Sequence, residues 1–181
     1  MQDINIIIKC KNRNEGKYFG VFMKKKVHKG NGNILVFSLD EPHYALYLSE
    51  IERVIRSVEI IPLPKAPDVV SGVINFHGEI IPVVDIRNRF RLPSRDINLD
   101  DRFIIARTSK RLVVIIVDSV DGVFELDSNQ IVDAGVTFPY TEYLSGIAKI
   151  ENVIVLINDL ENFLSLDEHK KLNKALSGDK E

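Results

Sequence analysis

A stretch of 15 residues occurs twice in this chain, with the same order of features each time. The first copy is Gly72–Ile86 and the second is Gly146–Leu160, which lie 74 positions apart. Each copy has a glycine, an apolar strand, a turn residue that tolerates positive φ, a second apolar strand and an aspartate placed to cap a helix. Two such hairpins in a chain of 181 residues predict an internally duplicated β protein.

The duplication continues on the N-terminal side of both hairpins. Residues 45–55 match residues 114–124 at a shift of 69 positions, so the second copy contains an insertion of five residues. We expect two copies, residues 34–90 and 103–164, each with about five short strands and a closing helical turn. Copies this short leave no room for crossover helices, which favours antiparallel strands closed into two small barrels that pack face to face.

Other segments carry simpler patterns. Residues 1–33 end in a run of lysines and a Gly/Asn linker, which predicts a poorly ordered extension or a start codon at Met23. Residues 167–181 are expected to form a C-terminal helix and tail. The nearly all-apolar strands Leu112–Val117 and Val153–Ile157 predict burial on both faces.

The composition argues against several classes of function. The net charge of −2 gives no bulk attraction to DNA or to an anionic membrane. Cys10 is the single cysteine, and the four histidines have no metal-ligand spacing, so we expect no disulfide, no metal and no cofactor. The chain has neither a basic, apolar leader nor an apolar run of about 20 residues, which favours a cytoplasmic protein.

Four aspartates at strand ends raise the possibility of an enzyme of the aspartic protease type. They are Asp85, Asp118, Asp121 and Asp159. That chemistry needs two carboxylates that share a proton, within Asp-Ser/Thr-Gly tripeptides, and none of the four has this context. Asp85 and Asp159 are better explained as helix N-caps, so the sequence predicts no catalytic residue.

A cluster of arginines after the first hairpin has two explanations. Arg87, Arg89, Arg91 and Arg95 could contact nucleic acid, but no aromatic residues are interleaved with them for base stacking. A solvated charged face is the favoured interpretation.

The remaining candidate is a surface that binds another protein. The turn His77-Gly78 lies at a hairpin tip beside a proline-rich connector, and two barrels side by side leave a groove for a partner. Ile51 and Val54 either line that groove or belong to the core, and both are apolar in the two copies of the repeat.

Four segments closely resemble the CheW-like chemotaxis coupling domain: Ile34–Leu39, Tyr44–Val54, Ile61–Pro64 and Gly72–Arg87. The last one reads Gly-Val-Ile-Asn-Phe-His-Gly-Glu-Ile-Ile-Pro-Val-Val-Asp-Ile-Arg, close to the family pattern G-V-x-N-L-R-G-x-x-x-P-V-x-D-L-R. The resemblance covers roughly residues 33–166. It implies two intertwined SH3-like five-stranded barrels around a shared core.

The resemblance also implies a function. Family members are non-enzymatic adaptors that link methyl-accepting chemoreceptors to a CheA-type histidine kinase, by pairing with the kinase's own CheW-like regulatory domain. Such a protein works in the cytoplasm at membrane-associated receptor arrays, without inserting into the membrane and without nucleic acid. The alternative is a CheW-like interaction module in a divergent, non-chemotactic pathway.

Carried over position by position, the receptor-facing residues of the family fall on two segments of this chain. They are Ile51 and Arg53 in the first segment, and Gly72, Asn75, Phe76, His77 and Gly78 in the second. His77 stands where the family usually has arginine, so a permanent charge is replaced by one that depends on pH. Contact of His77 with a carboxylate would therefore strengthen toward acid pH.

Overall fold

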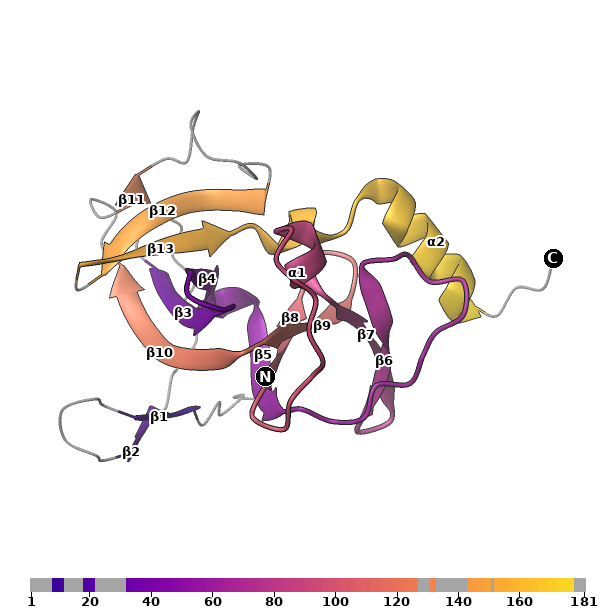
Figure 1. The fold of residues 1–181 in the computed structure, drawn as a ribbon, viewed down its shortest axis with the longest axis horizontal. Coiled ribbons are helices and arrows are strands. Elements are labelled where there is room, and N and C mark those ends of the chain that lie inside the picture. The colour runs from indigo at the N-terminus through magenta and orange to yellow at the C-terminus, as the bar shows by residue number, and fades with distance from the viewer. Residues whose placement is uncertain are drawn as a thin grey trace, which may run out of the picture.

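The computed structural model describes residues 8–11, 18–21, 32–126, 131–132, 143–150 and 152–177. Its main body consists of two β-sheets side by side, with the short helix α1 (Ile86–Arg89) between them and the helix α2 (Leu166–Ser177) along one sheet (Figure 1). The strands β1 (Ile8–Lys11) and β2 (Tyr18–Val21) form a separate antiparallel pair.

The first sheet has five strands in the order β5-β8-β9-β7-β6. Their bounds are Ile51–Arg56 for β5, Arg102–Arg107 for β8, Leu112–Val117 for β9, Glu79–Val84 for β7 and Val70–Phe76 for β6. The second sheet has six strands in the order β10-β3-β4-β13-β12-β11. Their bounds are Ser119–Leu126 for β10, Gly32–Ser38 for β3, His43–Tyr47 for β4, Val153–Asn158 for β13, Leu144–Ile150 for β12 and Ile131–Val132 for β11.

Each sheet contains strands from both copies of the sequence repeat. The first sheet combines β5, β6 and β7 of the first copy with β8 and β9 of the second. The second sheet combines β3 and β4 of the first copy with β10 to β13 of the second. The copies have therefore exchanged their first two strands, and one copy does not form one sheet.

This exchange corrects the expectation of purely antiparallel sheets. Strand β7 pairs with β9 in parallel, at Val83 and Val114, and β13 pairs with β4 in parallel, at Ile157 and Ala45. No hairpin connects either pair, because the two strands come from different copies, so nothing forces them to be antiparallel.

Local irregularities repeat with the sequence shifts, which confirms the duplication. A bulge between Ile51 and Arg53 matches one between Val120 and Gly122, 69 positions on. A second bulge between 70 and 72 matches one between 144 and 146, 74 positions on. The backbone has thus kept in both halves the same interruptions that bend and twist a strand.

Three apolar clusters form the core. One lies on each sheet, and the largest lies between the sheets and gathers side chains from strands and helices of both halves. In β3, Leu35 and Phe37 join the shared cluster while Ile34 and Val36 join the second sheet's own cluster. Successive side chains of a strand point to opposite faces, so such a strand is buried on both.

The prediction of burial on both faces is confirmed for one strand and wrong for part of another. Residues 113–117 of β9 are all buried. In β13, however, Val153 is 41% exposed and Ile154 is 61% exposed. These two residues lie next to the β12–β13 turn, beyond the part of the strand that other elements cover.

Candidate protein-interaction site

The tip of the β6–β7 hairpin is a two-residue turn, as the sequence predicts. Phe76 pairs with Glu79, and His77 and Gly78 between them have φ of 53° and 90°. Positive φ at both central positions matches the right-handed twist of a hairpin but favours Asn-Gly, so the conformation of His77 is an uncommon one. The Gly78 amide donates a hydrogen bond of 2.9 Å to Asn75 Oδ1, which stabilises the turn.

Three of the predicted residues form a stack on the surface. The ring of His77 lies against that of Phe76, with centroids 4.3 Å apart and planes inclined by 13°. The guanidinium carbon of Arg53 lies 5.5 Å from the centroid of the Phe76 ring, within cation–π range. Arg53 and His77 are exposed and Phe76 is half-buried, so a partner can reach all three.

Arg53 reaches this stack from a distant part of the first sheet. Strands β5 and β6 are its two outermost strands, yet Arg53 on β5 contacts Phe76 on β6. The sheet therefore curls until its edges approach each other, and one basic and aromatic surface results.

The other predicted residues are buried or build the framework. Ile51 is 5% exposed and lies in the core shared by the two sheets. Val54 is half-buried and packs against the same core. Gly72 is also buried, with φ of 151°, and a Cβ there would lie 2.4 Å from the Ile61 carbonyl oxygen. That close approach lets Ile61 pair with Val73 through two hydrogen bonds of 2.8 Å, which fix the proline-rich connector to the edge of β6.

The arginine cluster is a solvated face only in part, because Arg91 is the one member of the four that is exposed. Arg87 is buried, and its guanidinium bonds to Asp40 at 2.9 and 3.1 Å and to Asp118 at 2.6 Å. These bonds raise the pKa of Arg87, and the bond that Asp40 accepts has the largest effect. Arg95 bonds to Asp118 as well, and also to Asp101. The network joins segments of both halves that lie 31 and 47 positions from Arg87, a separation that no local pattern reveals.

Two of the candidate catalytic aspartates are helix caps. Asp85 Oδ1 accepts a hydrogen bond of 2.9 Å from the amide of Arg87 at the start of α1. Asp159 Oδ1 accepts one of 3.0 Å from the amide of Glu161 in the short 3₁₀ helix η4 (Leu160–Phe163). A third, Asp118, is occupied by the arginine network, and Asp121 lies 3.0 Å from a ring nitrogen of His43.

The described residues contain neither a cluster of metal ligands nor a membrane-spanning helix. No three His, Cys, Asp or Glu side chains there are close enough together to hold a metal ion. No helix in that part of the chain is both long and apolar enough to cross a bilayer.

Exposed apolar residues mark the two equivalent hairpins. Ile80 of β7 is 49% exposed, and Ile154, which corresponds to it 74 positions on, is even more exposed. Both positions are isoleucine in the aligned repeats, but the sequence does not predict that these two side chains are exposed.

Known proteins are similar to this chain in both sequence and fold. The CheW-like domain matches residues 33–168. The chemotaxis protein CheW of Thermotoga maritima is 32% identical over 131 residues, which span 72% of this chain and 86% of that protein. The chemotaxis protein CheW of Klebsiella aerogenes is 28% identical over 137 residues, which span 74% of this chain and 82% of the relative.

Among solved structures, one of a scaffolding protein is similar over most of the chain. The crystal structure of TtCheW from Thermoanaerobacter tengcongensis has a TM-score of 0.70 and 33% sequence identity, and the match covers 76% of this chain and 94% of that one. The duplicated sheets, the hairpin motif and these matches agree: the chain belongs to the CheW-like domain family.

Proposed function

We propose that this chain is a non-enzymatic adaptor of chemotaxis-type signal transduction, which couples the cytoplasmic tips of chemoreceptors to a CheA-type histidine kinase. The observation that carries the proposal is the exposed stack of Arg53, Phe76 and His77 at a rigid hairpin tip. An aromatic ring between a guanidinium and an imidazole suits binding to a protein surface, where aromatic residues and arginine supply most of the binding energy. Relatives named as chemotaxis proteins support the choice of pathway.

The predicted receptor-binding residues take different roles in this proposal. Arg53, Phe76 and His77 contact the receptor, and Asn75 and Gly78 hold the turn that presents them. Ile51 and Gly72 support these strands from within. The working unit is residues 34–166, with 1–33 as an extension, and it acts in the cytoplasm at membrane-bound receptor arrays through its partners.

The kinase would bind elsewhere, at the β12–β13 hairpin of the second sheet. Val153 and Ile154 offer exposed apolar contacts there, whereas the equivalent Ile80 lies on the same hairpin as His77. A CheW-like domain of the kinase has the same fold, so edges and hairpins of the two proteins can pair with each other.

The test measures binding to each partner separately. The purified chain is titrated with a receptor cytoplasmic fragment and with the kinase's CheW-like domain, both encoded by the same genome. We expect His77→Glu to weaken receptor binding by about tenfold or more and to leave kinase binding unchanged. Lys170→Glu, a charge reversal at an exposed position of α2, is the matched control. Failure of the unmodified chain to bind either partner would overturn the proposal.

His77 also favours a second candidate, a CheW-like module that serves a divergent, non-chemotactic pathway. A histidine in the place of the family's usual arginine changes what the turn can recognise, since arginine carries a fixed fork of donors and histidine does not. Capture of an unrelated receptor by the unmodified chain, lost in His77→Glu, would favour this candidate. Stronger receptor binding at acid pH would show that His77 faces a carboxylate.

A further inference from the structure

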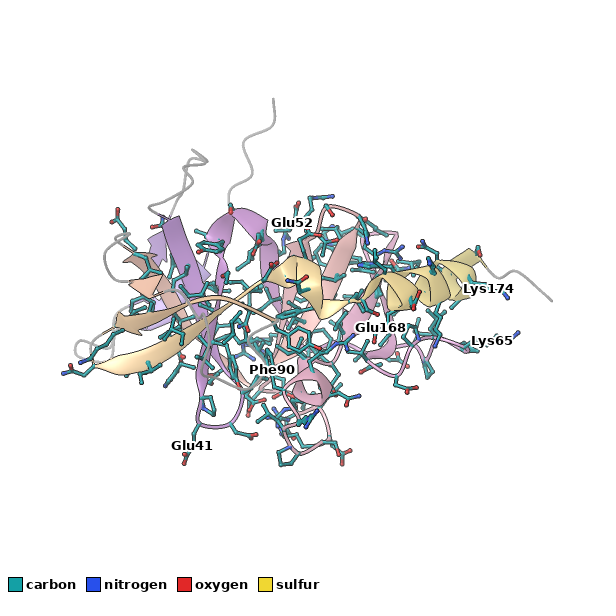
Figure 2. All side chains as sticks on the ribbon, turned by 90° about the horizontal axis from the view of Figure 1, so that it is seen from above. Glu41, Glu52, Lys65, Phe90, Glu168 and Lys174 are labelled. Carbon is teal, nitrogen blue, oxygen red and sulfur yellow. The ribbon has the colours of Figure 1, made fainter. Side chains whose placement is uncertain are left out.

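A groove with a basic rim runs between helix α2 and the connector that leads into β6. Its larger part is a cavity of about 460 Å³, lined by Lys65, Ala66, Pro67 and Asp68 on the connector and by Glu168, Lys171, Lys174 and Ala175 on α2. Figure 2 shows Lys65 and Lys174 at the same end of the molecule, one on each wall. Alanine and proline form apolar parts of its lining.

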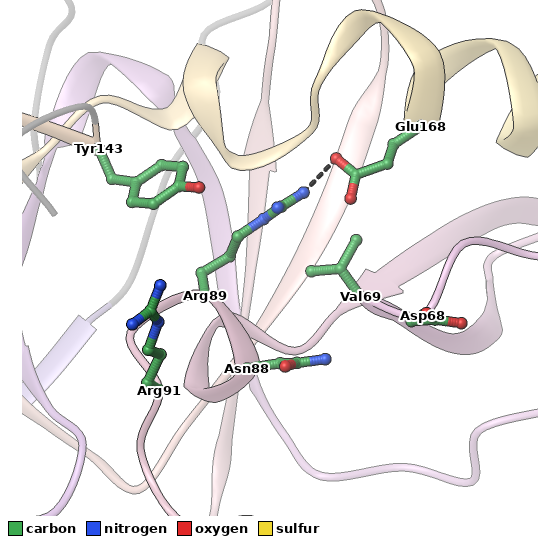
Figure 3. Close-up of a pocket in the computed structure, with 7 residues that line it drawn as sticks. All are labelled: Asp68, Val69, Asn88, Arg89, Arg91, Tyr143 and Glu168. Atoms are coloured by element: carbon green, nitrogen blue, oxygen red, sulfur yellow. Dashed lines mark hydrogen bonds and ion pairs between the residues drawn. The ribbon is translucent and has the colours of Figure 1, made fainter.

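The groove continues toward the junction of the two halves. A second cavity of about 290 Å³ shares Asp68 and Glu168 with the first, and Arg89, Arg91 and Tyr143 also line it. In Figure 3, Arg89 extends between the ring of Tyr143 and the carboxylate of Glu168. The two cavities therefore form one elongated depression with basic side chains along its length.

The acidic residues in the groove do not cancel its positive charge. Glu168 is occupied, because it accepts bonds from Arg89 and from the amide of Ser165. Burial alone would raise the pKa of Glu168, but the bonds from Ser165 and Arg89 hold it below its ordinary value. Lys65 and Lys171 have no ion-pair partner among the described residues. Among the residues that line the groove, Asp68 is then the carboxylate left to oppose Lys65 and Lys171.

Both walls are held firmly in place. Leu172 of α2 is fully buried in the shared core, and Asn173 accepts a hydrogen bond from Arg111 on the facing hairpin. On the connector, Lys65 has φ of 63°, within a turn closed by a bond from the amide of Ala66 to the carbonyl oxygen of Leu63. A lysine held in the left-handed region carries backbone strain, a feature that clusters at binding sites. Arg91 in the adjoining cavity has φ of 51°, the same uncommon conformation.

We infer that this groove binds an acidic peptide segment of a partner protein in extended form. A lining that combines cations with alanine and proline suits a segment that combines carboxylates with small apolar side chains. A lone phosphate group would use only one end of so long a depression. The groove lies at the start of β6 and the His77 turn at its end, and a strand of seven residues separates them by about 20 Å. The groove is therefore a site apart from the hairpin tip, and its partner can bind together with the receptor.

The probe is a fluorescein-labelled peptide of alternating glutamate and alanine, titrated into the full chain. We expect saturable binding that weakens as salt rises, with amide NMR shifts confined to the lining of the two cavities, residues 65–69, 88–91, 143 and 168–175. The double variant Lys65→Glu/Lys171→Glu should bind roughly tenfold more weakly, since two exposed attractions become repulsions of similar size. Lys149→Glu, on the other half of the molecule, should bind as the unmodified chain does.

Several results would overturn the inference. The first is the absence of peptide binding, and the second is an equal loss of peptide affinity in Lys149→Glu and in the double variant. The third is displacement of the peptide by millimolar inorganic phosphate. Binding of the chain to phosphatidylglycerol vesicles through the same lysines, without peptide binding, would assign the groove to a membrane surface instead. His77→Glu serves to separate the two proposals, because it should leave peptide binding unchanged whatever it does to the receptor.

Discussion

Single residues at equivalent places in the two halves have opposite electrostatic roles. Arg87 follows the cap Asp85 and bonds to Asp40, whereas Glu161 follows the cap Asp159 and accepts two bonds from Ser109. The shifts of 74 and 69 positions relate these two contacts. One half therefore has a buried cation among carboxylates, and the other has a carboxylate where that cation would be.

Glu50 shows the consequence of this missing cation. Burial, and then the charges of Asp159 and Glu161, raise its pKa to about 7. The folded state therefore holds a proton that the unfolded state loses near pH 4.5, so the free energy of unfolding should fall as pH rises from about 4.5 to 7. We expect Glu50→Gln to remove this part of the decline and to be more stable than the unmodified chain at pH 8. Urea unfolding at pH 5 and pH 8 tests this, and an unchanged pH dependence in the variant would contradict it.

Replacing a glycine can cause steric overlap and backbone strain, and Gly72 and Gly78 differ in which of these applies. A Cβ at Gly72 would lie 2.4 Å from a backbone oxygen, which no rotamer change can relieve, whereas one at Gly78 would meet nothing within 4 Å. We expect Gly72→Ala to lower the free energy of unfolding by about 3 kcal/mol, from overpacking and backbone strain together. Gly78→Ala should cost only about 1 kcal/mol, from strain alone. Denaturant unfolding measures both, and equal losses would refute the assigned close approach.

At the scale of the element, α2 depends on a buried histidine. His169 faces the core side of the helix, is 5% exposed, and its Nδ1 has no hydrogen-bond partner among the described residues. Burial, and then Lys110 and Arg111, lower its pKa, although Glu161 and Glu168 act in the other direction. Docking of α2 therefore favours the neutral imidazole over the protonated one.

Acid should loosen this helix. The unfolded state takes up a proton near pH 6.5 while the folded state resists it, so the stability contributed by His169 is lost as pH falls through that value. We expect the amides of α2 to exchange hydrogen faster at pH 5.5 than at pH 7.5, after correction for the intrinsic rate. His169→Leu should keep the packing and abolish the difference. Equal acid sensitivity in the variant would show that another group controls the helix.

Local patterns predicted those elements that local forces determine. The turn at His77-Gly78 and the caps at Asp85 and Asp159 each depend on residues within a few positions, so the sequence sufficed. The approach of Arg53 to Phe76 depends on how far a sheet curls, which no residue pattern records. The sequence likewise could not predict the burial of Ile51, because an apolar residue at the start of a strand suits a core and a surface groove equally well.

At the scale of the whole molecule, the sequence gives the number of copies but not which strands pair. Period-two patterns determine the face that a strand buries, and that face is the same whether its neighbour comes from its own copy or from the other. The resemblance to a known family implied intertwined barrels where the residues alone favoured separate ones. The exchange of β3 and β4 for β8 and β9 also explains the depth of the shared core, since these strands are largely buried on both faces.

The exchange makes a prediction about fragments. If the chain is divided in the loop before β8, at residues 96–100, neither piece contains a complete sheet. The first piece lacks β8 and β9 of the first sheet, and the second piece lacks β3 and β4 of the second sheet. We expect residues 32–98 and 99–177 to be unfolded separately, without dispersed amide NMR signals. Mixed in equal amounts they should form a one-to-one complex with the spectrum of the intact body, because the bond from Arg87 to Asp118 and the parallel pairs β7–β9 and β4–β13 join the two pieces.

The control for this experiment lies within the same network. Arg87→Ala in the first fragment leaves the carboxylates of Asp40 and Asp118 without their shared cation, so the complex should form at least tenfold more weakly. Lys149→Glu in the second fragment changes an exposed charge outside the network and should have little effect. A single fragment that folds alone would show that its strands can form a sheet within one copy. The exchange of strands between copies would then not be required for folding.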